Sequence, residues 1–225
     1  MEKNEKNEKN EKSKKTSWVY VLSVVYVIVA YTFFFISGYI NQLELPDNLV
    51  SARNTLAWIF LCLPIILCVS NYIIMFTIGK KVERKTLLNC AILVKYGLIP
   101  FYILGAILIL MFLLFSFTPV PFMIFVGPYM IFVLNVIGWV ILIGSAPFAI
   151  AYIMKSHKEG IHGKALSIIT GILQFVFAFD VISIMILTVK EKRWKKLTFT
   201  ILALLLTLLF ACIIGFITLI LVTIF

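Results

Sequence analysis

The length of its apolar runs is what most constrains this chain. The last stretch, Leu197–Phe225, holds 29 residues without a single charged side chain. A helix needs roughly 20 apolar residues to cross a hydrocarbon core about 30 Å thick. The strands of a membrane barrel alternate polar and apolar residues, whereas the runs here are continuous. The sequence therefore predicts an all-α protein, a polytopic integral membrane helical bundle.

Composition and charge agree with this class. Of the 225 residues 62% are hydrophobic and 13% are charged, about half the charged fraction of a soluble domain. The net charge of +10 would suggest a nucleic-acid partner in a soluble protein. Here the cations lie in short loops beside apolar segments, which is the pattern that orients membrane helices. We therefore expect no nucleic-acid partner, and we expect the basic loops to face anionic lipids of the bilayer.

The chain divides into a charged tail and six hydrophobic segments. Residues 1–17 form a Glu-Lys-Asn repeat with no apolar residue after Met1, so we predict a disordered cytoplasmic tail. Residues 18–225 are predicted to form a single transmembrane helical domain. Its hydrophobic segments are 18–40, 55–78, 87–117, 122–154, 165–189 and 197–225.

The loop charges predict an orientation. The loop Gly79–Thr86 carries four cations and one glutamate, and Lys155–Lys164 is also basic. Both are therefore predicted to be cytoplasmic, which also places the N-terminus on the cytoplasmic side. The loop Asn41–Asn54 has one arginine against two acidic residues, and the uncharged turn Thr118–Pro121 follows the third segment. We expect both of these to lie outside.

The fifth segment does not fit the alternation of cytoplasmic and external loops. If 165–189 crosses the membrane, the loop Lys190–Lys196 falls outside, although it contains five cations and a single glutamate. Alternatively, 165–189 enters from the cytoplasm and returns to it as a broken re-entrant hairpin, with Gly171 as a possible break. The sequence therefore allows six spans, or five spans plus a re-entrant element.

Two other segments also allow alternatives. The stretch 87–117 is either one tilted helix that carries Lys95 well inside, or an interfacial helix that leads into a span beginning near Leu98. The stretch 122–154 contains Gly127-Pro128, so its first part is predicted to be a short re-entrant or interfacial piece. Pro64 is predicted to kink the second segment.

Lys95 and Asp180 are the charged side chains that most need an explanation. A charge at the centre of a bilayer costs roughly 2.5–3.5 kcal/mol on insertion scales. With a rise of 1.5 Å per residue, Lys95 lies about 15 Å beyond Lys85, and a re-entrant 165–189 places Asp180 about 15 Å from Lys190. In that topology an ion pair is possible, whereas six spans separate the two depths by about 9 Å. Otherwise Lys95 extends to the interface, and Asp180 is protonated or hydrogen-bonded to a neighbouring helix.

Four amides add to the polar content of the apolar segments. They are Asn71, Asn89, Asn135 and Gln174, and we expect them to form hydrogen bonds between helices. Together with Lys95 and Asp180, the residues Gln174 and Asn135 make up the candidate intramembrane polar site.

No catalytic constellation is found in the sequence. The histidines His157 and His162 share one loop in which only Glu159 is a nearby acidic companion, so no metal site is predicted. The four cysteines all lie in apolar segments without a CxxC pair. Nucleophile elbows, zinc-binding helices and phosphate-binding glycine loops are also missing. We therefore expect no enzyme activity and no cofactor.

Two stretches resemble a known family. They are LLNCAILVKYGLIPFYILG (Leu87–Gly105) and ALSIITGILQFVFAFDVISIMILTVKEKRWKK (Ala165–Lys196). Both resemble segments of an uncharacterised family of small multi-spanning membrane proteins of Gram-positive bacteria. The resemblance implies a bacterial cytoplasmic membrane location and carries no activity or ligand.

Two functions remain for a protein of this class. The first is a non-enzymatic membrane component, a partner or accessory subunit that binds a protein partner or further copies of itself. The alternative is a small-molecule transporter or a substrate-binding membrane subunit, in which the polar site lies near the midplane between broken helices.

Overall fold

The structure is a computed structural model that describes residues 2–44, 46–117 and 122–224. At 2–16, 47, 212–213, 215–217 and 219–224 it describes the backbone alone. All regular secondary structure among the described residues is helical, which confirms the predicted all-α class. The chain forms two units, Met1–Ile184 and Met185–Phe225, and each is treated by itself.

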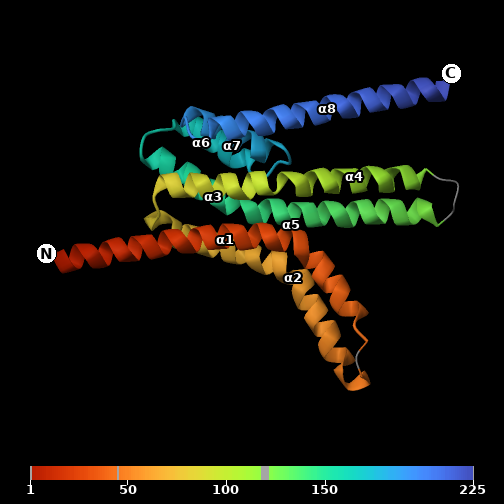
Figure 1. The fold of residues 1–225 in the computed structure, drawn as a ribbon, viewed down its shortest axis with the longest axis horizontal. Helices are drawn as coiled ribbons and strands as arrows, with labels where there is room; N and C mark the ends of the chain where they lie inside the picture. Colours follow the sequence, from red (N-terminus) through yellow and green to blue (C-terminus); the bar gives the residue numbers. More distant parts are fainter. Residues whose placement is uncertain (1, 45, 118–121, 225) are drawn as a thin grey trace. The chain divides into compact units, whose positions relative to one another are not determined.

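The first unit is built around one central helix. Its elements are α1 (Glu2–Gln42), α2 (Asp47–Thr77), η1 (Gly79–Lys81), α3 (Arg84–Gly97), α4 (Ile99–Ser116), α5 (Met123–Lys158) and α6 (Lys164–Leu173), followed by the start of α7 (Phe179–Lys190). Helix α5 packs against α2, α3, α4 and α6, and α1 packs against α2 and α3. Helices α1 and α2 run side by side as a hairpin, and α4 lies along α5 (Figure 1).

Four helices are long and apolar enough to cross a membrane. They are Ser17–Gln42, Asn48–Lys81, Arg84–Ser116 and Met123–Lys158. The structure therefore has four candidate spans within the described residues, and the six predicted from the sequence are not confirmed. Pro64 lies inside α2, which bends along its length (Figure 1), as expected where a proline removes a helical hydrogen bond.

Two of the predicted interruptions are resolved in favour of continuous helices. The amides of Leu98 and Tyr102 donate to the carbonyls of Val94 and Leu98 at 3.0 and 3.1 Å, so α3 continues into α4 with only a local irregularity near Pro100. The stretch Arg84–Ser116 is therefore one candidate span, while its tilt and the depth of Lys95 in a membrane stay predictions. The break expected at Gly127-Pro128 is wrong, because α5 runs unbroken from Met123 and includes Pro128.

The fifth segment is broken, as one alternative required. Helix α6 has 10 residues and α7 has 12, and the residues 174–178 between them are non-helical. At 1.5 Å per residue each half is about 15–18 Å long, which is too short to cross a 30 Å core. Gly171 is not the break, since it lies within α6. The chain instead turns at Ala178, a non-glycine residue with φ 66°.

The ends of the chain show further differences from expectation. Helix α1 already begins at Glu2, so the backbone of the charged repeat is helical, and the disorder of the tail stays a prediction. The turn Thr118–Pro121, expected outside, is outside the described residues. In the second unit, α8 (Lys195–Ile224) is a 30-residue helix over the stretch predicted as the last span.

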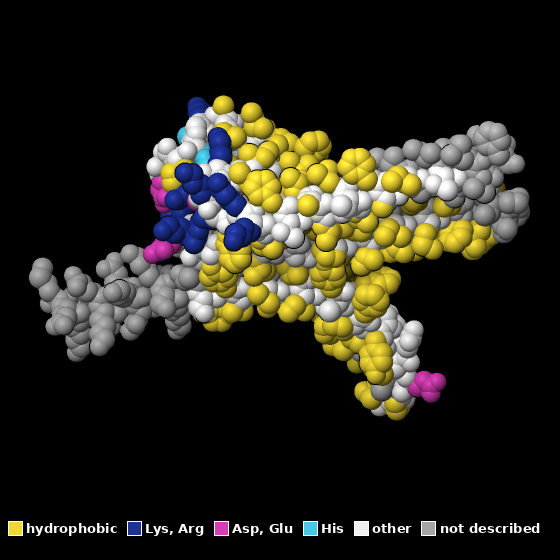
Figure 2. Space-filling model, turned by 45° about the horizontal axis from the view of Figure 1, so that its top comes forward, with side chains coloured by type: hydrophobic (Ala, Val, Ile, Leu, Met, Phe, Trp, Pro, Cys, Tyr) yellow, Lys and Arg dark blue, Asp and Glu magenta, His cyan; other side chains and the backbone are white. Residues whose placement is uncertain are grey.

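The exterior of the described residues is largely apolar, and a few charged and amide side chains are buried among the apolar side chains of the core. Many large apolar side chains are exposed, among them Phe35 at 76% and Trp58 at 65%, and hydrophobic side chains cover much of the visible surface (Figure 2). In contrast, Lys95, Asp180 and Gln174 are 0% exposed. Apolar side chains on the exterior, with the few charged side chains turned inward, are what a hydrocarbon solvent favours.

Close approach of α1 to α5 depends on Gly144. The Tyr26 hydroxyl donates to the carbonyl of Ile141 at 2.7 Å and lies directly over Gly144, where a Cβ would collide with it. On the other side, Asn71 Nδ2 donates to the Gly144 carbonyl at 2.9 Å. One glycine thus allows two neighbouring helices to bond to the backbone of α5.

Replacing Gly144 by alanine is expected to lower the thermal unfolding temperature in detergent. The added methyl group displaces the Tyr26 hydroxyl, and overpacking of this kind costs about 1–3 kcal/mol. Gly105→Ala is the matched control, because a Cβ there meets nothing within 4 Å and alanine is the better helix former. Equal stability changes in the two variants would contradict the close α1–α5 contact.

Candidate functional site: a buried ion pair beside a broken helix

Lys95 and Asp180 form an ion pair in the interior of the first unit. Lys95 Nζ lies 2.9 Å from Asp180 Oδ2, and both side chains are 0% exposed. The same ammonium donates a hydrogen bond of 2.8 Å to Ser145 Oγ, which in turn donates to the carbonyl of Leu142 at 2.7 Å. The ion pair that the sequence allowed in the re-entrant alternative is therefore present.

Three helices position this cluster. Lys95 lies in the last turn of α3, and Ser145 lies on the central helix α5. Asp180 occupies the first turn of α7, where the exposed amides at a helix N-terminus favour a negative charge. The break before α7 thus creates the helix end that stabilises the Asp180 carboxylate.

The break itself is tied to the ion pair by hydrogen bonds. Gln174 Nε2 donates to Ser183 Oγ at 2.6 Å and to the carbonyl of Thr170 at 3.1 Å. Ser183 Oγ donates to the Asp180 carbonyl at 2.9 Å. Gln174 therefore bridges the end of α6 and the first turns of α7, and it belongs to the same polar cluster as Asp180.

Aromatic contacts hold the other side of the break. Phe177 makes edge contacts with Tyr102 of α4 and Trp139 of α5, at centroid distances of 5.9 and 5.3 Å. Gly138 leaves room for the Phe177 ring, because a Cβ at that position would lie 3.2 Å from it. The non-helical segment is therefore packed against two long helices.

Several buried oxygens at this site have unused hydrogen-bonding capacity. Asp180 Oδ1, Gln174 Oε1 and the Tyr102 hydroxyl each lack a hydrogen-bond partner among the described residues. Buried polar atoms are normally bonded to protein or to ordered water, so the cluster has the chemistry to hold water or a small polar group. It combines one fixed cation, one carboxylate and neutral donors and acceptors.

Asn135 is not part of this cluster. Its side chain is exposed and its Nδ2 donates to the Ile131 carbonyl of the same helix at 2.9 Å. The expectation of an interhelical bond is therefore wrong for Asn135. It is correct for Asn71, described above, and for Asn89, whose Nδ2 donates to the Tyr20 hydroxyl at 2.9 Å.

Four residues of the cluster were not singled out from the sequence. They are Tyr102, Ser145, Phe177 and Ser183. Ser183 had a signal, because it follows Asp180 by three residues and so lies on the same helical face. Ser145 and Tyr102 had none, since single serines and tyrosines are common in apolar helices.

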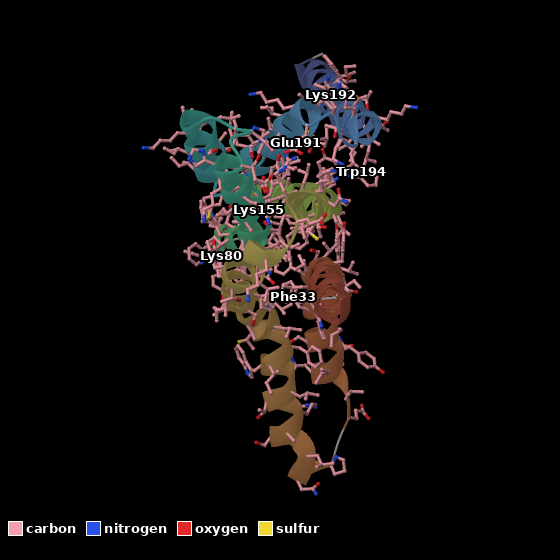
Figure 3. The ribbon with its side chains drawn as sticks, turned by 90° about the vertical axis from the view of Figure 1, so that its left-hand side faces the viewer. Phe33, Lys80, Lys155, Glu191, Lys192 and Trp194 are labelled. Atoms are coloured by element: carbon pink, nitrogen blue, oxygen red, sulfur yellow. The ribbon has the colours of Figure 1, made fainter. Side chains whose placement is uncertain are left out.

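Two of the basic loops meet at one end of the first unit. Arg84 Nε pairs with Glu159 Oε2 at 2.8 Å, and Lys155 Nζ donates to the carbonyls of Val82 and Lys80. Lys80 and Lys155 are labelled beside each other in Figure 3. The loops that were both predicted to be cytoplasmic thus lie on the same side.

The same end contains the two histidines. His162 Nε2 and the Tyr152 hydroxyl share a hydrogen bond of 3.1 Å, and His157 Nδ1 lies 3.2 Å from the His162 carbonyl. Among the described residues, no three His, Cys, Asp or Glu side chains are grouped so that they could hold a metal ion.

Single replacements in the ion pair are expected to destabilise the protein far more than the double replacement. Lys95→Met or Asp180→Leu leaves one buried charge without its partner, which costs about 3–5 kcal/mol. The Lys95→Met/Asp180→Leu variant removes both charges. Its free energy of unfolding should lie within about 1 kcal/mol of that of the original protein. Thermal unfolding in detergent measures all three. Strictly additive losses would show that the two side chains do not depend on each other.

Comparison with known proteins identifies a family without a known activity. Residues 12–196 match the group described as Family of unknown function (DUF6652), and both stretches that carry the resemblance noted from the sequence lie inside this range. No curated protein and no solved structure matches the chain. The match covers well over half of the chain, and so the protein belongs to the DUF6652 family of unknown function.

Proposed function

We propose that this protein is a non-enzymatic, multi-pass component of the cytoplasmic membrane of a Gram-positive bacterium, acting as a partner or accessory subunit. The observation that carries the proposal is the meeting of two basic loops at one end of a helical unit with an apolar exterior. Cations from Gly79–Thr86 and Lys155–Lys164 face the same side, as a positively charged cytoplasmic surface requires. Such a surface binds anionic headgroups and acidic regions of a soluble partner.

The broken segment supports the topology that this proposal needs. Two half-helices of 10 and 12 residues can enter a membrane and return to the same side, which keeps Lys190–Lys196 cytoplasmic with the other basic loops. The N-terminus is then cytoplasmic as well. All the dense cation clusters of the chain share one side in this topology.

A transporter or substrate-binding subunit is the second candidate, and the interior of the first unit favours it. A discontinuous helix beside a buried carboxylate is the arrangement that many transporters use near the midplane. The unbonded oxygens of Asp180, Gln174 and Tyr102 supply acceptors for a polar solute. In this case the ion pair acts as part of the binding site and not only as a structural contact.

Cysteine labelling tests the topology. In a variant without the native Cys62, Cys68, Cys90 and Cys212, we expect Lys195→Cys to be protected from an impermeant thiol reagent in intact cells and labelled after permeabilisation. Glu44→Cys is the matched control, because it should be labelled in intact cells. Labelling of Lys195→Cys in intact cells would overturn the re-entrant arrangement and support a full crossing by 165–189.

Charge changes separate the two functions. Under the accessory-subunit proposal, reversing Lys192, Lys195 and Lys196 to glutamate should abolish co-purification of the proteins that accompany the original chain. Reversing Lys3, Lys6 and Lys9 of the tail is the control and should retain them. The neutral pair Lys95→Gln/Asp180→Asn should also retain them, because it preserves the shape of the interior.

A transporter predicts the opposite pattern. The neutral pair would then abolish the thermal stabilisation produced by a sugar, amino acid or organic cation from a screening panel, while the loop variant would keep it. Glu44→Cys labelling of the loop variant checks that the charge reversal has not inverted the protein in the membrane.

A further inference from the structure

A small cavity at the basic end has the composition of a lipid headgroup site. It lies where the end of α2 and η1 meet the last turns of α5, with a volume of about 170 Å³. A single buried water needs a cavity volume of only about 10–15 Å³, so this cavity has room for a larger polar group. Its walls include three cations, Lys80, Lys155 and Lys158, and a single acidic residue, Glu159.

The charge balance of this cavity favours an anion. The one carboxylate, Glu159, is engaged by Arg84 at 2.8 Å, so its negative charge is already compensated. Lys155 is held in place by the backbone carbonyls of Val82 and Lys80, which neutralise no charge. Lys80 and Lys158 are exposed at the rim and are free to move toward a bound anion.

The remaining walls are apolar and continue onto the exposed surface. Met75, Phe76, Ala151 and Met154 line the cavity, and Phe76 and Met154 are 36% and 40% exposed. A soluble phosphate would need only the cations. A glycerophospholipid needs both parts, since its phosphodiester meets the lysines while its glycerol and upper acyl chain lie along the apolar side chains.

We propose that this cavity binds the phosphodiester headgroup of an anionic glycerophospholipid. The inference rests on the membrane location given under the proposed function and deepens it, because it assigns the lipid contact to one cavity between helices. Bound lipid would connect the end of α2 to the end of α5, in addition to the contacts of Arg84 and Lys155.

Lipid-dependent stabilisation of the full chain in detergent tests this proposal. Short-chain phosphatidylglycerol should raise the unfolding temperature, whereas phosphatidylcholine of the same chain length and inorganic phosphate should not. In Lys80→Gln/Lys158→Gln the phosphatidylglycerol concentration for half-maximal stabilisation should rise about tenfold or more. Lys81→Gln/Lys164→Gln is the matched control, because it removes the same charge from exposed lysines that do not line the cavity, and it should respond as the original protein does.

Several outcomes would overturn the inference. No stabilisation by phosphatidylglycerol, or an equal loss in both double variants, would show that the cavity has no specific role. Equal stabilisation by inorganic phosphate would assign the cavity to a soluble anion. Cysteine labelling reports membrane topology without reference to headgroup binding, so a failure of the proposed function is distinguishable from a failure here.

Discussion

The interaction on which the first unit depends is the buried pair of Lys95 and Asp180. Moving either charge alone out of water costs several kcal/mol, so each side chain is tolerable only where the other is within reach. That requirement brings the end of α3 to the start of α7 at 2.9 Å. The helix break before α7 follows from the same constraint, because it supplies a helix N-terminus for the carboxylate and turns the chain toward α3.

The other residues of the cluster hold the non-helical segment between α6 and α7 in one conformation. Gln174 and Ser183 bond the end of α6 to α7, and Phe177 packs against Tyr102 and Trp139. The unsatisfied oxygens remain beside the ion pair. Buried polar atoms are normally bonded to protein or to ordered water, so these oxygens are the part of the interior that the described residues leave incompletely bonded.

How much of this was predictable differs from residue to residue. The pairing of Lys95 with Asp180 could be predicted, because the rise per residue of a helix converts the sequence distance from a basic loop into a depth in the membrane. The course of α5 through Gly127-Pro128 was not, since a proline in a long helix is tolerated when neighbouring helices satisfy the freed carbonyl. Asn135 was expected to bond between helices and instead bonds its own helix. Sequence spacing does not tell which face of α5 meets a neighbour.

The sequence by itself determined the class of protein, the helical segments and the positions of the basic loops, since these depend on local composition and on segment length. Only the tertiary structure decided that 164–190 is two half-helices, that Ser145 and Tyr102 join the polar cluster, and that the loops after α2 and α5 meet at one end. The polar cluster depends on contacts between residues far apart in the chain, such as Lys95 with Ser145, 50 positions away, and with Asp180, 85 positions away. Local composition does not identify such partners. Any apolar face of a helix is stable against hydrocarbon, so a few polar contacts determine how the helices pack.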